Sequence, residues 1–102
     1  MSTLHTVNKS PFERDSLSSC IRLSSKGHAI LLIEDGIFGA LSGTEHSEMV
    51  SAAMKDASVY VLGPDLAARG MSEERVIDGI QVVDYSGFVE LTTQHDTCQS
   101  WL

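Results

Sequence analysis

The sequence predicts an α/β protein: a small, flavodoxin-like three-layer α/β/α sandwich around a mainly parallel sheet of four to five strands. Short, almost continuous apolar runs alternate along the chain with segments of helical periodicity. Such runs are typical of strands covered on both faces, and intervening helices are typical of the crossovers between parallel strands. Because 102 residues can bury one core but not two, we expect a single domain over residues 1–102.

The expected strands and helices follow one another in a regular order. The predicted elements are a strand at 4–7, a helix at 11–25, a strand at 29–33, a helical turn at 37–41, a helix at 44–55, a strand at 59–62, a short helix at 66–69 capped by Asp65, a strand at 80–83, and a helix from Ser86 to 95. A tail ending in Trp101 and Leu102 completes the chain.

The first helix has the clearest end signals. Ser10-Pro11-Phe12-Glu13 has the spacing of a capping box, with proline at the first helical position. Lys26-Gly27 supplies a cation and then a residue that tolerates a left-handed stop. These limits place Cys20 about two turns from either end, far from the N-terminal amides that best stabilise a thiolate.

Composition excludes several classes of function. Seven basic and fourteen acidic residues give a net charge of −7, which repels phosphate backbones and anionic lipid. We therefore expect no direct binding to nucleic acid or membrane. Two cysteines do not make a disulfide framework, residues 1–27 lack signal-peptide character, and no segment approaches about 18 apolar residues. The expected compartment is the cytoplasm, with reduced thiols.

The ends of the predicted strands carry most of the polar groups suited to a site. Functional groups of a parallel sheet gather at the carboxyl ends of its strands. Here those ends offer Asn8-Lys9, Glu34-Asp35-Gly36, Gly63-Pro64-Asp65 and Asp84-Tyr85-Ser86. Glu34-Asp35 is similar to the acidic pocket of receiver domains, but the phosphoacceptor aspartate and later lysine of that pocket are not in order. We therefore interpret this segment as a solvated turn.

No cofactor is expected. Glycines 36, 39 and 43 have the wrong spacing for a phosphate-binding loop or a dinucleotide fingerprint, and no Gly-Lys-Ser/Thr follows them. The four histidines, which lie on different predicted elements, are His5, His28, His46 and His95. Only the weak pair of His46 and Met49 has ligand spacing, so surface or hydrogen-bonded histidines are favoured over a metal site.

Cys20 has two interpretations. Leu17, Cys20 and Ile21 share one helical stripe, and free cysteine often packs as a small hydrophobe. However, the same helix is rich in serine, which would let another protein approach the sulfur closely. Arg14 or Arg22, folded back over the sulfur, could stabilise a thiolate or persulfide anion. Cys98 lies in the tail without an evident activating neighbour, and we interpret it as incidental.

Segments spread over nearly the whole chain resemble the DsrH/TusB family. Their order and spacing carry the resemblance, since no single motif would suffice. The segments are Leu4-His5-Thr6, Ser10-Pro11-Phe12, Leu31-Leu32-Ile33-Glu34-Asp35-Gly36, Tyr60-Val61-Leu62-Gly63-Pro64-Asp65-Leu66, Ala68-Arg69-Gly70, Val83-Asp84-Tyr85, Phe88-Val89-Glu90-Leu91-Thr92 and Gln99-Ser100-Trp101-Leu102.

The resemblance implies the DsrEFH-like fold and the small subunit of a cytoplasmic sulfur-relay complex without cofactors. Such complexes are dimers of heterotrimers. The implied partners are a DsrE/TusD-like subunit with the principal acceptor cysteine, a DsrF/TusC-like subunit and, through the complex, a DsrC/TusE-like sulfur carrier. In the TusB branch the sulfur serves 2-thiolation of the tRNA wobble uridine; in the DsrH branch the complex serves oxidation of stored sulfur.

Residue 20 favours the DsrH branch, because the resemblance aligns Cys20 with the cysteine typical of DsrH proteins. Cys20 is then a candidate auxiliary persulfide acceptor in a largely non-catalytic subunit, and the TusB branch is the alternative. A free-standing thiol reductase is a further alternative, but it needs a low-pKa cysteine at a helix start with a resolving cysteine nearby. A ligand-binding module is weakened by the missing phosphate loop.

Overall fold

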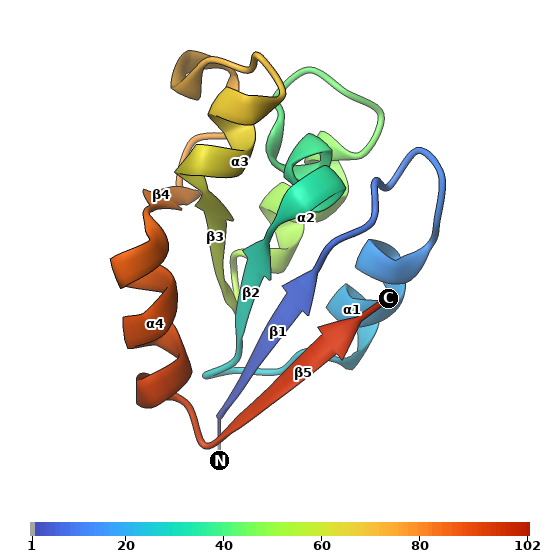
Figure 1. The fold of residues 1–102 in the computed structure, drawn as a ribbon. Helices are drawn as coiled ribbons and strands as arrows, with labels where there is room; N and C mark the ends of the chain where they lie inside the picture. Colours follow the sequence, from blue (N-terminus) through green and yellow to red (C-terminus); the bar gives the residue numbers. More distant parts are fainter. Residues whose placement is uncertain (1) are drawn as a thin grey trace.

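A five-stranded parallel sheet forms the centre of the computed structural model, which describes residues 2–102 (Figure 1). The strand order is β4-β3-β2-β1-β5, and each neighbouring pair is parallel. The strands are β1 (Thr3–Val7), β2 (Ala29–Leu32), β3 (Ser58–Leu62), β4 (Gln81–Val83) and β5 (Thr97–Trp101). The predicted α/β class and parallel sheet are confirmed, and of the four to five strands expected the sheet has five.

The helices cover the two faces of the sheet unequally. They are α1 (Ser16–Leu23), the 3₁₀ helix η1 (Glu34–Ala40), α2 (Ser47–Ala53), α3 (Gly63–Ala68), the 3₁₀ turn η2 (Glu73–Arg75) and α4 (Tyr85–Gln94). Side chains of α1, η1, α2 and α3 share one core cluster, whereas α4 contributes to a second cluster on the opposite face. Figure 1 shows α4 alone beside β4 and β3, well separated from α1 and α2.

Strand β2 shows why the sequence of a central strand is continuously apolar. Its alternating side chains point to opposite faces, so Ile30 and Leu32 join the larger cluster while Ala29 and Leu31 join the smaller one. All four residues are at most 1% exposed. Full burial of each large aliphatic side chain contributes about 1.5–3 kcal/mol, which makes this strand the centre of the core.

The first helix begins later than its end signals predict. The prediction of a helix at 11–25 is wrong at its start, because the Ser10 carbonyl accepts hydrogen bonds from the amides of Glu13 and Arg14 and closes an isolated turn. Asp15 then leaves helical geometry, with φ −95° and ψ 16°, before α1 starts at Ser16. Cys20 therefore lies about one turn from the helix start, rather than two.

The C-terminal tail is a strand, which is not among the elements predicted from the sequence. Strand β5 pairs along its whole length with β1, with Thr97 opposite Thr3 and Trp101 opposite Val7. Polar residues fill β5, so it lacks the apolar run that identifies the inner strands. It is an edge strand and is mostly exposed, which explains why polar residues suit it.

Several other boundaries shift by a few residues. Helix α2 spans only Ser47–Ala53 of the predicted 44–55, and α3 begins already at Gly63 with Pro64 in its first turn. Asp84, not Ser86, caps α4, since its carboxylate accepts a 2.8 Å hydrogen bond from the Gly87 amide. No helix within residues 2–102 is long and apolar enough to cross a membrane.

Candidate functional site

Cys20 points from α1 into the larger core cluster, with Leu17 on the same buried face. Its side chain is 0% exposed. The Cys20 Sγ lies 3.9 Å from Ser24 Oγ, and the Ser24 hydroxyl donates a 2.8 Å hydrogen bond to the Cys20 carbonyl. Burial raises the pKa of the Cys20 thiol to about 11, against a smaller lowering by the Ser24 hydrogen bond. The sulfur is therefore a neutral thiol at physiological pH.

Neither candidate arginine folds over the sulfur. The Arg14 guanidinium donates to the Glu13 carbonyl at 3.4 Å, and the Arg22 guanidinium donates to the Ser19 hydroxyl at 3.2 Å. Both side chains are directed to the exposed surface of the α1 region. Neither arginine is therefore placed to stabilise a Cys20 thiolate or persulfide.

Two shallow grooves border α1 and α2 and share Met49. One, of about 330 Å³, is lined by Ile21, Ser24, Met49, Ala52, Ala53, Asp56 and Ala57. The other, of about 470 Å³, is lined by Pro11, Phe12, Glu13, Arg14, Asp15, Ser18, His46 and Met49. Ser24, whose hydroxyl lies 3.9 Å from the Cys20 sulfur, separates that sulfur from the first of these grooves.

Cys98 lies on the other side of the sheet. It is exposed on β5, opposite Leu4 of β1, whose side chain belongs to the smaller core cluster beneath α4. Because side chains alternate along a strand, Cys98 faces away from Trp101, which packs against the cluster that contains Cys20. The sheet separates the two thiols. This arrangement does not provide the resolving pair that a free-standing thiol reductase needs.

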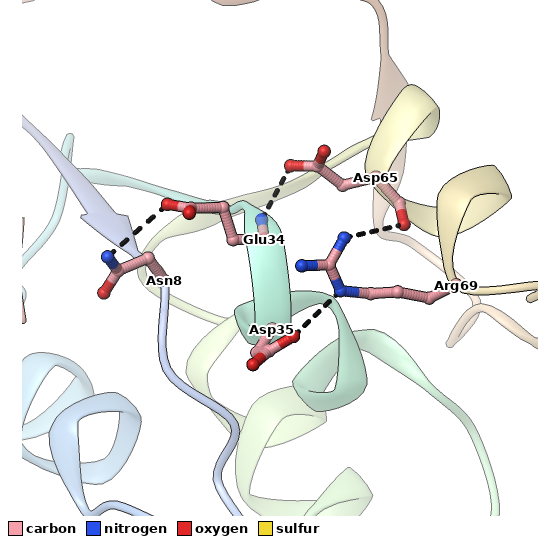
Figure 2. Close-up of polar contacts among 5 residues, drawn as sticks. All are labelled: Asn8, Glu34, Asp35, Asp65 and Arg69. Atoms are coloured by element: carbon pink, nitrogen blue, oxygen red, sulfur yellow. Dashed lines mark hydrogen bonds and ion pairs between the residues drawn. The ribbon is translucent and has the colours of Figure 1, made fainter.

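The carboxyl ends of β1, β2 and β3 meet in the polar network drawn in Figure 2, as their sequence positions predict. The Glu34 amide donates to the Asp65 carboxylate at 2.6 Å, and Asn8 Nδ2 donates to Glu34 Oε2 at 3.5 Å. Arg69 Nε pairs with Asp35 Oδ1 at 2.9 Å. Arg69 has no role in the site predicted from the sequence, although it lies four residues after Asp65 on the same short helical segment.

This network is suited to fastening the β2–η1 turn to α3. Glu34 and Asp35 are exposed, which agrees with the interpretation of a solvated turn. Asp84 does not join the network and instead caps α4. Within residues 2–102, no three His, Cys, Asp or Glu side chains are placed to hold a metal ion.

The fold brings together two histidines that lie 23 residues apart in the sequence. His5 on β1 is 3% exposed, and its Nε2 lies 3.0 Å from Nδ1 of His28. The Trp101 indole nitrogen donates to Nδ1 of His5 at 3.0 Å. His46 instead stacks edge-on against Phe12, and His95 bonds the Leu91 carbonyl. Only the pairing of β1 with β5, which the sequence did not reveal, places Trp101 beside His5.

The geometry defines a small α/β protein with a five-stranded parallel sheet and a thiol packed in its core. A sequence model of the family described as "DsrH like protein" matches residues 9–98, so the chain belongs to this family. It is 37% identical over 100 residues to Protein TusB of Pectobacterium parmentieri, covering 96% of this chain and 99% of that protein. It is 36% identical over 98 residues to Protein TusB of Shigella flexneri, with the same coverage.

A solved structure supports the fold independently. The protein MTH1491 of Methanobacterium thermoautotrophicum, described as of unknown function, superposes with a TM-score of 0.78. The match covers 97% of both chains at 17% sequence identity. At that identity the likeness establishes the fold alone.

Proposed function

We propose that this chain is the TusB-type subunit of a cytoplasmic sulfur-relay assembly that supplies persulfide sulfur for 2-thiolation of the tRNA wobble uridine. Its partners in this proposal are TusC- and TusD-like homologous subunits, arranged with it as a dimer of heterotrimers, and a TusE-like carrier. The observation that carries the proposal is the nearly full-length similarity to proteins named TusB. These relatives favour the thiolation branch over the sulfur-oxidation branch that Cys20 suggests.

The geometry supports an assembly role for this subunit. The Cys20 thiol is buried and neutral, and neither Arg14 nor Arg22 is placed to stabilise its anion. A sulfur relay needs an accessible thiolate that can meet a persulfide on a second protein. The TusD-like subunit would supply that thiolate, and this chain would stabilise and orient the assembly.

Exposed hydrophobic side chains occur on both sides of the molecule. Tyr85 and Val89 lie one turn apart on α4 and are 60% and 62% exposed. On the other side, Leu23 at the end of α1 is 67% exposed. Contact with sister subunits on both faces would remove this apolar surface from water, which is the usual source of free energy for stable association.

Persulfide acceptance at Cys20 is the second candidate function, favoured by the presence of cysteine at position 20. In this step the Cys20 thiol loses its proton and the thiolate attacks the outer sulfur of a partner's persulfide. The donor S–S bond breaks, a persulfide forms on Cys20, and the donor leaves as a thiolate that takes up the proton released by Cys20. Since the isolated chain buries the sulfur, the step requires the assembly to displace Ser24 or the end of α1.

Deleting the gene for this chain tests whether it serves tRNA thiolation or the oxidation of stored sulfur. We expect 2-thiouridine at the wobble position to disappear from digested tRNA, measured by mass spectrometry, and to return with the wild-type chain. Return of the modified base with Cys20→Ala, at wild-type assembly levels, would support the assembly role without Cys20 chemistry. Normal thiolation combined with loss of stored-sulfur oxidation would overturn the proposal in favour of the DsrH branch.

A further inference from the structure

Four side chains form a continuous hydrogen-bond chain from the C-terminal strand to the turn before β2. The Trp101 indole Nε1–H donates to His5 Nδ1 at 3.0 Å. His5 Nε2 lies 3.0 Å from His28 Nδ1, and His28 Nε2 lies 3.2 Å from Ser25 Oγ. The members come from β5, β1 and the 24–28 turn, so the chain joins three separate parts of the fold.

The direction of every hydrogen bond follows from its first member. An indole nitrogen is only a donor, so His5 Nδ1 has to accept, and the proton of the neutral ring lies on Nε2. His5 Nε2–H then donates to His28 Nδ1, which places the His28 proton on Nε2. His28 Nε2–H in turn donates to Ser25 Oγ. Both imidazoles are neutral, with the same tautomer.

Protonation of either imidazole disrupts this sequence of donors and acceptors. Protonated His5 would carry Nδ1–H against the indole N–H, and protonated His28 would carry Nδ1–H against His5 Nε2–H. An imidazolium donates from both nitrogens, so each event leaves two donors facing one another. His5 is 3% exposed and has little access to water that could satisfy the displaced donor.

Burial and the neighbouring His28 also disfavour the protonated form of His5. Burial, and secondly the charge of a nearby protonated His28, lower the pKa of His5 below its usual 6.5. Strands β2 and β5 carry no charged side chain, and within residues 2–102 no carboxylate is hydrogen-bonded to either ring. Three other titratable or charged groups on the elements packed here are the neutral Cys20 thiol, the exposed Arg22, which is bonded to Ser19, and the exposed Lys26. Cys98 on β5 is also titratable, but it lies on the opposite face of the sheet.

We propose that this hydrogen-bond chain is a pH-sensitive latch that fastens the C-terminal end of β5 to β1 while both imidazoles are neutral and opens on acidification. Strand β5 is at the sheet edge, and within residues 2–102 it pairs with β1 alone, so no second strand would hold it by hydrogen bonds if the latch opened. Opening would loosen Trp101 and the adjoining terminus while the inner strands keep their pairing. The inference does not depend on the proposed function.

Nuclear magnetic resonance of the full chain, labelled with ¹⁵N on histidine and tryptophan, tests the latch in whichever assembly the chain forms. The sequence holds one tryptophan, so the indole signal needs no further assignment. We expect the Nε2–H tautomer for both His5 and His28 at pH 7.5. Exchange of the indole proton, corrected for its intrinsic pH dependence, should accelerate at least tenfold as His5 becomes protonated.

Trp101→Phe keeps an aromatic ring but removes the opposing N–H. A neutral hydrogen bond is worth about 0.5–1.5 kcal/mol, so His5 should bind its proton roughly 2- to 10-fold more tightly in this variant. His95→Gln is the matched control, because His95 bonds the Leu91 carbonyl and should leave the His5 titration unchanged. An Nδ1–H tautomer of His5 in the wild-type chain would overturn the proposal even if Trp101→Phe does not fold. An exchange rate of the indole proton that does not change when His5 is protonated would also overturn it.

Discussion

Ser24 Oγ lies 3.9 Å from Cys20 Sγ and donates its own proton to the Cys20 carbonyl, one turn back along the helix. Burial at the inner face of α1 keeps the sulfur protonated, against a smaller lowering of the thiol pKa by the contact with Ser24. It leads to the first two predictions, which concern the reactivity of this thiol and its contribution to packing.

The two thiols should differ strongly in reactivity. With a pKa of about 11, only about one Cys20 in a thousand is a thiolate at pH 8, and burial blocks access to the sulfur. Cys98 is exposed and should react with iodoacetamide at least tenfold faster. Peptide mass spectrometry over a time course measures both sites, and unfolding in denaturant should equalise them. Equal labelling of both sites in the folded chain would contradict the buried position of Cys20.

Substitution of Cys20 measures its packing. Cys20→Ala removes one buried sulfur and should lower the free energy of unfolding by about 1–2 kcal/mol. Cys20→Ser should be the more destabilising of the two, because it buries a hydroxyl group where a weakly polar thiol lay. Cys98→Ala, the exposed control, should change stability by less than about 0.5 kcal/mol. Urea unfolding gives all three values. If Cys20→Ser left the free energy of unfolding unchanged, the Cys20 side chain would have to be more accessible to water than its buried position allows.

Gly36 should not tolerate a side chain. A Cβ at this position would overlap the carbonyl of Val7, which already accepts a hydrogen bond from Ile33, so the backbone would have to move. Gly36→Ala should therefore destabilise the fold by more than about 3 kcal/mol. Gly27 is the matched control, because its φ of +86° disfavours alanine but nothing lies near its Cβ. Gly27→Ala should cost only about 1–2 kcal/mol, and equal losses would contradict the close β1–η1 contact.

Asp65 and Asp35, two of the three carboxylates in the strand-end network, should contribute unequally. Asp65 accepts the Glu34 amide at 2.6 Å, so Asp65→Ala leaves a backbone donor without that partner and should cost about 1–2 kcal/mol. Asp35 pairs with Arg69, but its side chain is 56% exposed, and Asp35→Ala should cost less than about 1 kcal/mol. Asp65→Asn keeps an acceptor oxygen and should recover most of the loss. The reverse ranking in urea unfolding would contradict the network in Figure 2.

Stability should rise with pH through the range in which His5 titrates. The pKa of His5 is lowered in the folded chain, so between that value and about 6.5 the unfolded chain binds more protons. The free energy of unfolding therefore increases with pH over this window, and the His5 contribution is constant above it. Urea unfolding from pH 5 to 8 measures the slope, with His95→Gln as the histidine control. A slope that survives in His5→Gln would assign the effect to another group.

The sequence predicts the centre of this fold better than its edges. Continuous apolar runs identify β2 and β3 because both faces of these strands are buried. The same rule fails for β5, an exposed edge strand whose polar residues pack against little. The Ser10-Pro11 signal is real, but it closes a turn, since local capping cannot specify how many residues follow.

The candidate site shows the same limit. Helical periodicity placed Cys20 on the buried stripe, and strand ends placed Glu34 and Asp65 together. The contact of His5 with His28 and Trp101 depends instead on which strands pair, and no local pattern encodes that order. Arg69 could have been found from its helical spacing to Asp65 and the lack of another cation nearby.

The central claim is that this chain works as one subunit among homologous partners. Native mass spectrometry of the tagged full-length chain, purified from its own cells at low ionic strength, tests this most directly. We expect an assembly that contains a TusC-like and a TusD-like chain with this one in equal numbers, and separation into monomers only under denaturing conditions. A monomer that remains alone when both partner chains are present at working concentration would contradict the account.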